Sequence, residues 1–177
     1  MGVFFTADQH FGHKNIIEYC NRPFSDVEEM NEALIENWNK TVDNNDKIFV
    51  LGDFALGSSE NIIKWGRALK GNKMLILGNH DRASKSVYLE AGFKEVSKYP
   101  IVWNQRYILS HAPIWWDEKM PFTSILNMNG AYCFNVHGHI HDNPIETDPT
   151  GRCCVCVERT DYKPLKEIKV WKQVWGD

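Results

Sequence analysis

At 177 residues and 20.5 kDa the chain is long enough for one domain with a substantial hydrophobic core, and we expect residues 1–177 to form that single domain. Its 43% hydrophobic and 24% charged residues exclude a disordered chain, and no apolar run is long enough to cross a membrane. The formal net charge of −3 provides no general basic surface, which argues against long nucleic acid as a partner.

The N-terminus and the cysteines both favour a cytoplasmic protein. The start of the chain shows no basic region, long apolar run or cleavage site of a secretion signal. Five cysteines are an odd number, which favours reduced thiols over disulfides. Cys153 and Cys156 form a C-x-x-C, but the run 153–157 is strand-like and no second pair completes a zinc site. We interpret these cysteines as small buried residues of a strand.

The first half of the chain alternates apolar strands with amphipathic helices. In chain order we predict a strand over 3–10, a helical piece ending at Tyr19, a helix over 27–42, a strand over 48–53, a helix between Gly57 and Gly71, and a strand over 73–77. Such a β-α-β-α-β order predicts a largely parallel sheet with right-handed crossovers.

The second half is richer in strands. They are predicted over 93–96, 100–103, 107–110, 132–137, 152–158 and 167–171, and residues 104–106 are few enough for a hairpin. An aromatic loop is expected between Pro113 and Gly130. Four of its residues could line a wall for a nucleobase or an aryl group, although we favour a loop packed over the core: Trp115, Trp116, Met120 and Phe122.

Metal-capable side chains stand where the predicted strands end. The first strand ends in Asp8 and His10, and side chains at that spacing point to the same side of an extended chain. Later strand ends add the remaining candidates: Asp53, Asn79, His80, Asp81, His111, His139 and His141. Ligands bind at the carboxyl ends of strands in open α/β sheets, so we expect these loops to meet. A single histidine is more often a surface or core residue, but the conjunction favours one metal cluster.

These motifs together resemble the motif set of the calcineurin-like metallophosphoesterases. The motifs are Asp8-x-His10, Gly52-Asp53, Gly78-Asn79-His80-Asp81, Ser110-His111 and Gly138-His139-Ile140-His141. The resemblance extends from the first strand to at least His141, with no departure at the metal or acid positions. The ending over 155–158 and the stretches Gly12-His13 and Asn21-Arg22-Pro23-Phe24 resemble small, single-domain bacterial and phage-type members.

The resemblance implies a fold and a ligand set. The fold is α/β, a four-layer α/β/β/α sandwich of two mixed sheets flanked by helices. Two divalent ions share Asp53, and each has three further ligands. One ion is held by Asp8, His10, Asp53 and His141, and the other by Asp53, Asn79, His111 and His139. Carboxylate, amide and imidazole ligands suit Mn, which we favour, and also Fe, Zn, Ni, Co or Mg.

This centre predicts a hydrolase for phosphate esters. Two adjacent cations can neutralise a phosphate and lower the pKa of a shared water, so that a bridging hydroxide attacks. His80 is positioned to protonate the leaving alkoxide as general acid. By the resemblance Asp81 orients His80, while loop capping is an equal alternative for Asp81. Arg22 and His13 are candidates for binding the phosphate, the alternatives being a surface arginine and a loop histidine.

We therefore predict a dinuclear metal-dependent phosphoesterase that hydrolyses phosphodiesters or phosphomonoesters of small substrates, including nucleotides. A non-catalytic metal-binding scaffold module is one alternative, but such modules often lose acid or ligand residues, and none is missing here. A nuclease is another alternative, although it needs a basic track for the strand, which the net charge does not support. The sequence leaves the natural substrate and the oligomeric state open.

Overall fold

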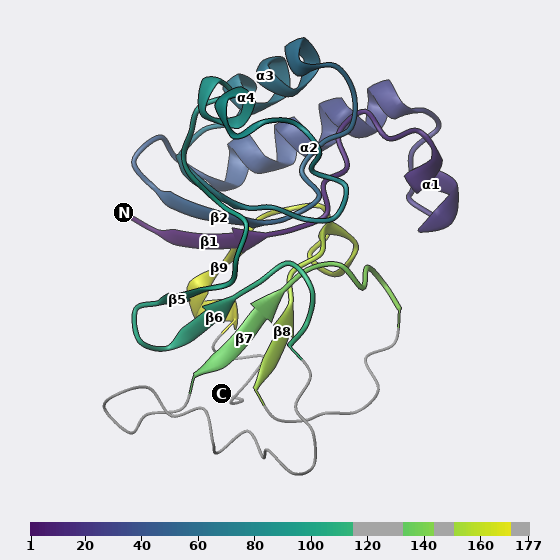
Figure 1. The fold of residues 1–177 in the computed structure, drawn as a ribbon. Coiled ribbons are helices and arrows are strands. Elements are labelled where there is room, and N and C mark those ends of the chain that lie inside the picture. Colours follow the sequence, from purple (N-terminus) through teal and green to yellow (C-terminus); the bar gives the residue numbers. More distant parts are fainter. Residues whose placement is uncertain (115–132, 144–150, 171–177) are drawn as a thin grey trace.

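Two mixed β-sheets pack face to face in the computed structural model, which describes residues 1–114, 133–143 and 151–170 (Figure 1). The first sheet has the order β4 (Phe93–Ser97), β3 (Asn72–Ile76), β2 (Lys47–Leu51), β1 (Val3–Thr6) and β9 (Leu165–Lys166). The second has the order β5 (Ile101–Trp103), β6 (Tyr107–Leu109), β7 (Phe134–His137) and β8 (Arg152–Cys154). In each sheet one edge strand, β9 or β5, runs antiparallel to a parallel set. The expected α/β architecture with two mixed sheets is confirmed.

Helices cover the outer face of the first sheet (Figure 1). They are α2 (Val27–Thr41), α3 (Ser59–Ala68) and α4 (Lys85–Glu90), and the short helix α1 (Asn15–Tyr19) lies to one side of them. Asp26 begins α2, because its side chain accepts a hydrogen bond from the Glu29 N–H at 2.8 Å. Four-residue spacing then places Met30, Leu34 and Trp38 on the buried face of α2. Among the described helices, none is both long and apolar enough to cross a membrane.

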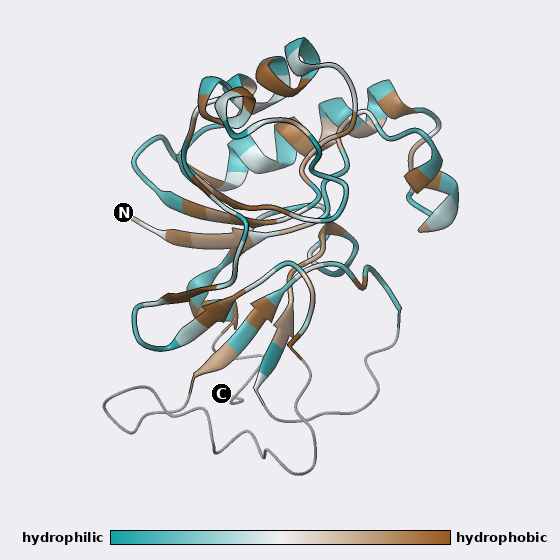
Figure 2. Ribbon diagram, viewed as in Figure 1, coloured by the Kyte–Doolittle hydropathy of each residue, from teal (hydrophilic) through white to brown (hydrophobic). Residues whose placement is uncertain are grey.

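The alternation of side chains along β1 creates two separate cores. Phe4 packs into the core under the helices, whereas Phe5 points into the core between the sheets. There the Phe5 ring stacks on Phe49 at 5.6 Å and lies 5.5 Å from Tyr107 of the second sheet. Figure 2 shows hydrophobic residues concentrated on the strands, while the helices mix hydrophobic and hydrophilic residues. Both faces of the first sheet are therefore buried, which makes it a rigid support for the loops at its edge.

The structure corrects the sequence prediction near the C-terminus. Residues 167–170 are helical, and the last strand is β9, just before them. The strand predicted over 152–158 ends at Cys154, and a 3-10 turn spans Val157–Arg159. Helix α4 was not predicted. Apolar runs this short fit a strand and a helical turn equally well, so the surrounding tertiary contacts decide between them.

Candidate metal centre

The loops that follow five strands meet at one edge of the two sheets. Their carboxyl-terminal ends deliver Asp8 after β1, Asp53 after β2, Asn79 and His80 after β3, His111 after β6, and His139 and His141 after β7. His10 follows Asp8 in the loop after β1, so all eight side chains come from these loops. The structure therefore brings together the seven predicted metal ligands and the predicted acid, as expected for the strand ends of an α/β sheet.

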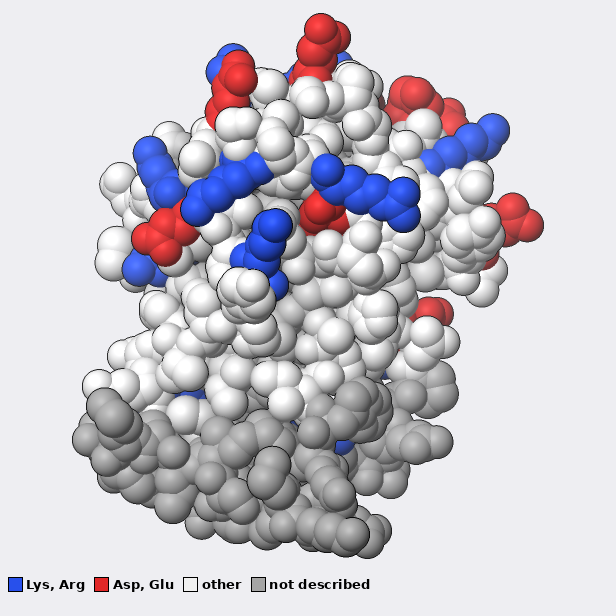
Figure 3. All heavy atoms as spheres, in the orientation of Figure 1, with Lys and Arg blue, Asp and Glu red and all other residues white. Residues whose placement is uncertain are grey.

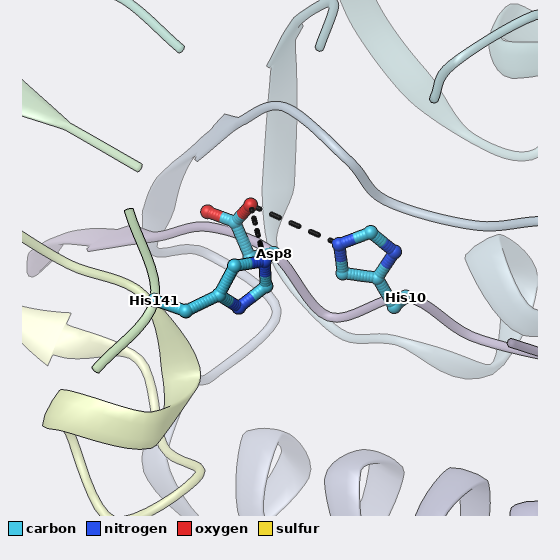
Figure 4. Close-up of side chains that lie close together, drawn as sticks. All are labelled: Asp8, His10 and His141. Carbon is cyan, nitrogen blue, oxygen red and sulfur yellow. Dashed lines mark ion pairs between the residues drawn. The ribbon is translucent and has the colours of Figure 1, made fainter. Parts of the chain in front are cut away.

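Three side chains make up the first donor group (Figure 4). The Oδ1 atom of Asp8 lies 3.9 Å from Nε2 of His10 and 3.7 Å from Nε2 of His141. Asp8 and His10 are buried, and His141 is partly exposed. Both imidazoles turn a nitrogen toward the same carboxylate oxygen, so the three side chains could together hold one metal ion.

A second donor group surrounds Nε2 of His111. That nitrogen lies 2.9 Å from Oδ1 of Asn79, 3.2 Å from Nδ1 of His139 and 3.6 Å from Oδ2 of Asp53. The other ring nitrogen of His111 lies 2.9 Å from the carbonyl oxygen of Leu51, which fixes the orientation of the ring. An amide oxygen, a carboxylate oxygen and two imidazoles therefore converge on one point.

Asp53 connects the two groups. Its Oδ2 atom lies 3.5 Å from Nε2 of His10 in the first group and 3.6 Å from Nε2 of His111 in the second. Its Oδ1 atom accepts a hydrogen bond of 2.8 Å from the backbone N–H of His80. The hydrogen bond holds one carboxylate oxygen, and the other faces both donor groups.

The donor atoms fit divalent cations. Asp8 Oδ1 and His10 Nε2 are buried and have no hydrogen-bond partner in the described part of the chain. Burying such atoms without a partner costs free energy, so each calls for a partner that the protein does not supply. The ligating atoms of Asp8, His10 and His141, and those of Asp8, Asp53 and His111, lie within 4.8 Å of one another. Oxygen and imidazole donors of this kind suit borderline divalent ions.

Left-handed backbone conformations aim the ligands. Five of the seven have positive φ angles, although none is glycine: Asp8 (61°), His10 (53°), Asp53 (52°), His139 (75°) and His141 (50°). Such angles are uncommon outside glycine and cluster at functional sites. Asp8 and His10 do converge, as predicted, but the predicted cause, alternation along an extended strand, is wrong. β1 ends at Thr6, and the loop after it turns both side chains inward.

Two glycines of the motifs permit the close approach of loops to carboxylates. A Cβ atom on Gly78 would overlap Oδ1 of Asp53, and one on Gly138 would overlap Oδ2 of Asp8. Both glycines immediately precede a metal-ligand candidate in the sequence. Because glycine has no side chain, each leaves room for the nearby carboxylate. The backbone N–H of His139 then donates a hydrogen bond of 2.8 Å to Asp8 Oδ2.

Burial favours the neutral form of two ligand imidazoles, His10 and His139. It lowers the pKa of His10 far below the ordinary value, and the Arg22 charge lowers that pKa further. The pKa of His139 is lowered by burial and by His111. Burial raises the pKa of Asp8 to about 6, against the opposing effect of His111 and His141. Neutral imidazoles offer lone pairs to a cation, and a cation beside Asp8 would favour its ionised form.

Glu158 is a site residue that the sequence analysis missed. Its Oε1 atom lies 2.9 Å from Nδ1 of His141 and accepts hydrogen bonds from Arg22 at 2.6 Å (Nη2) and 3.0 Å (Nε). With Nδ1 donating to this carboxylate, His141 keeps the lone pair of Nε2 for the cluster. Burial alone would lower the pKa of His141, but the hydrogen bond to Glu158 and the charge of Asp8 outweigh burial and raise it.

Arg22 lies behind the cluster, and its side chain is fully buried. Its guanidinium donates to the backbone carbonyls of Asp8 at 2.7 Å and Gln9 at 2.8 Å, in addition to Glu158. The predicted contact between Arg22 and a substrate phosphate does not agree with this position, because no part of the guanidinium faces solvent. Arg22 instead holds the strained 8–10 loop and Glu158 in place.

Asp81 caps the loops and does not orient His80. Its Oδ2 atom accepts hydrogen bonds of 2.8 Å from the N–H groups of both Asp53 and Gly78, and its Oδ1 atom accepts one of 3.0 Å from Phe54. The Tyr88 hydroxyl donates to the same Oδ1 at 3.2 Å. The capping alternative therefore holds: Asp81 ties the loop after β3 to the loop after β2.

The remaining candidates lie at the rim or in the core. His13 is partly exposed, and its Nδ1 lies 3.2 Å from Nδ1 of His10, which leaves Nε2 of His10 for the cluster. Cys153 and Cys156 are buried, as expected, and the Cys156 thiol also donates a hydrogen bond to Asp8 Oδ2 at 3.1 Å. The aromatic residues at 115, 116, 120 and 122 lie outside the described residues.

Comparisons with known proteins agree with this geometry. The model of the family described as calcineurin-like phosphoesterase matches residues 1–173. An uncharacterized protein of Methanocaldococcus jannaschii, MJ1445, is 36% identical over 172 residues, which cover 92% of this chain and 85% of that protein. The Gene 66 protein of Mycobacterium phage L5 is 41% identical over 82 residues, 45% of this chain and 39% of the phage protein. A crystal structure of a protein of unknown function from Aquifex aeolicus, AQ665, has a TM-score of 0.70 and 27% identity over 97% of this chain and 98% of that one.

Proposed function

Because this chain belongs to the calcineurin-like phosphoesterase family, whose members are metal-dependent phosphoesterases, we propose that it hydrolyses small phosphomonoesters or phosphodiesters at a centre of two divalent ions. The observation that carries this proposal is the position of Asp53 Oδ2, which lies 3.5 Å from one donor group and 3.6 Å from the other. A carboxylate oxygen in that position could be shared by two adjacent cations, which together clamp a phosphoryl group.

The two donor groups divide the ligands between the ions. Asp8, His10 and His141 would hold one ion together with Asp53. Asn79, His111 and His139 would hold the other, again with Asp53. We favour Mn for both, within the range of divalent ions that such donors accept. When bound, the cations supply Lewis acidity, which neutralises charge on phosphoryl oxygens and makes water more acidic.

His80 supplies the proton for the leaving group in this proposal. Its backbone N–H is anchored to Asp53 Oδ1 at 2.8 Å, and its ring lies 5.3 Å from the His10 ring and 6.0 Å from the His13 ring. The His80 side chain is partly exposed, and its ring makes no hydrogen bond within the described stretches of the chain. A ring in that position is free to reach a leaving oxygen. His13, at the same rim, is a candidate for holding the phosphate.

Substitution of His80 by Ala tests its role as the acid. We expect His80→Ala to slow hydrolysis of alkyl phosphate esters by about 10²–10⁴-fold, while 4-nitrophenyl esters, whose leaving group needs no proton, change little. The measurement is kcat for both ester types, with metal content per chain determined in parallel. Equal losses for the two ester types at unchanged metal content would reject the acid role.

Substitution of Glu158 by Gln tests the support of His141. The amide keeps the size of the side chain but removes the charge that fixes the His141 ring. We expect metal affinity to fall about 10–100-fold, as measured by competition with a chromophoric chelator. Glu36→Gln is the matched control, because Glu36 is exposed and pairs with Lys40 on the same helix, α2. Unchanged affinity in Glu158→Gln would contradict the assignment.

The charge pattern supports small substrates over long nucleic acid. On the face shown in Figure 3, the Lys and Arg side chains of the described residues are interspersed with Asp and Glu side chains. The chain as a whole carries a net charge of −3. A protein that follows a nucleic-acid backbone needs a positive groove along the strand. We therefore favour small phosphate esters as substrates.

A further inference from the structure

A hollow of about 340 Å³ opens beside His80. Its walls come from the loop after β2, the start of α3 and the loop after β3. Leu56 and Ile62 give it an apolar side, and Ser59, His80 and Arg82 give it a polar one. The His80 ring therefore borders both the hollow and the donor groups, since it also lies 5.3 Å from the His10 ring.

Arg82 places a positively charged side chain at the wall of this hollow. It is exposed, and it makes no hydrogen bond or ion pair with any residue that the structure describes. Other arginines of the described chain are engaged: Arg22 with Glu158, Arg67 with Glu90, and Arg159 with backbone carbonyls. A free guanidinium at the wall of a hollow is available to bind an anion through two parallel hydrogen bonds.

The proposed role of His80 gives the hollow a function. In the hydrolysis of a diester, the oxygen of water bonds to phosphorus, and the bond from phosphorus to the leaving oxygen breaks. That oxygen takes the proton of His80, and His80 recovers a proton released from the attacking water through solvent. The leaving group must therefore lie on the His80 side of the phosphate, where the hollow is.

We propose that this hollow binds the leaving group of the substrate, and that Arg82 recognises a second phosphate carried by that group. The substrate class is then a small phosphodiester whose leaving alcohol is itself phosphorylated. The volume is near the lower end of small-molecule sites, which run from about 300 to 1,000 Å³. It suits a group of sugar-phosphate size. This inference rests on the proposed phosphoesterase function.

Two synthetic diesters test the proposal. Both are methyl phenyl phosphates, one with a para phosphonomethyl group, whose carbon–phosphorus bond resists hydrolysis, and the other with a para ethyl group. We expect the metal-loaded protein to prefer the phosphonate diester by about tenfold in kcat/KM. Arg82→Ala should remove the preference by raising KM for that diester only. Lys98→Ala removes an exposed positive charge outside the hollow, and this variant should keep the preference for the phosphonate diester.

Binding of the product separates this inference from the proposed function. Calorimetry with 4-(phosphonomethyl)phenol should detect binding to the metal-loaded protein that Arg82→Ala weakens about tenfold. If that binding is found but neither diester is hydrolysed under any metal, the proposed function fails and the anion site stands. The inference would be overturned if the protein hydrolysed both diesters with equal kcat/KM. It would also be overturned if Arg82→Ala lowered kcat/KM equally for both diesters.

Discussion

Asp53→Asn should reduce hydrolysis of every phosphate ester by at least about 10³-fold, because it removes the oxygen shared by both donor groups. The His80 N–H donates to Oδ1 of Asp53 at 2.8 Å, so the amide oxygen of the variant must occupy that position. The amide NH₂ group then replaces Oδ2, where it faces His10 and His111. An NH₂ group has no lone pair for a cation. Steady-state kinetics and metal content per chain provide the measurement.

The control for this substitution is Asp26→Asn. It makes the same chemical change at the start of α2, where Asp26 accepts a hydrogen bond from the Glu29 N–H. Asn is an equally good residue at that position, so stability and activity should both stay near those of the unmodified protein. If the Asp53→Asn variant still bound two ions per chain and its kcat were unchanged, the assignment of Asp53 as the shared ligand would be contradicted.

Arg22→Met should lower the free energy of unfolding by about 3–5 kcal/mol. The change leaves Glu158 inside the protein without its cation, and it removes the donors to the carbonyls of Asp8 and Gln9. The strained backbone of the 8–10 loop would then lose its support. Urea unfolding of the metal-free protein measures this effect without a contribution from metal binding.

Arg67→Met is the matched control for Arg22→Met. Arg67 pairs with Glu90 at 3.4 Å, but both side chains are mostly exposed, at 61% and 59%. An exposed pair of this kind contributes less than about 1 kcal/mol to the free energy of unfolding. If the two variants lose the same small amount of stability, Arg22 does not hold the loop as described.

Local sequence patterns predicted the parts of the site that depend on strand ends. Asp8, Asp53 and His111 follow buried strands, and the carboxyl ends of neighbouring strands meet at one edge of a sheet. The motifs that contain Gly78 and Gly138 were informative for a physical reason, since a side chain at either position would overlap a carboxylate. The parallel order of β1, β2 and β3 follows from the same alternation of strand and helix.

Contacts between distant parts of the chain were not predictable. Glu158 meets Arg22 across 136 positions, and no local pattern marks it as the partner of His141. The same limit explains Arg22, which was expected either to bind phosphate or to lie on the surface, and which is buried in the folded chain. It also explains Asp81, whose partners include the backbone N–H groups of Asp53 and Phe54 on another loop. Only the folded chain determines which side of a loop a polar residue faces.

Counting the metal ions tests the central claim most directly. Elemental analysis of the metallated protein, combined with anomalous diffraction at the absorption edge of the metal, gives both the number of ions and their positions. The first donor group, which contains Asp8, and the second, which contains His111, predict two ions per chain, each within coordinating distance of Asp53. A single ion, or a pair of ions that does not share Asp53, would contradict the proposed catalytic centre even if the fold were as described.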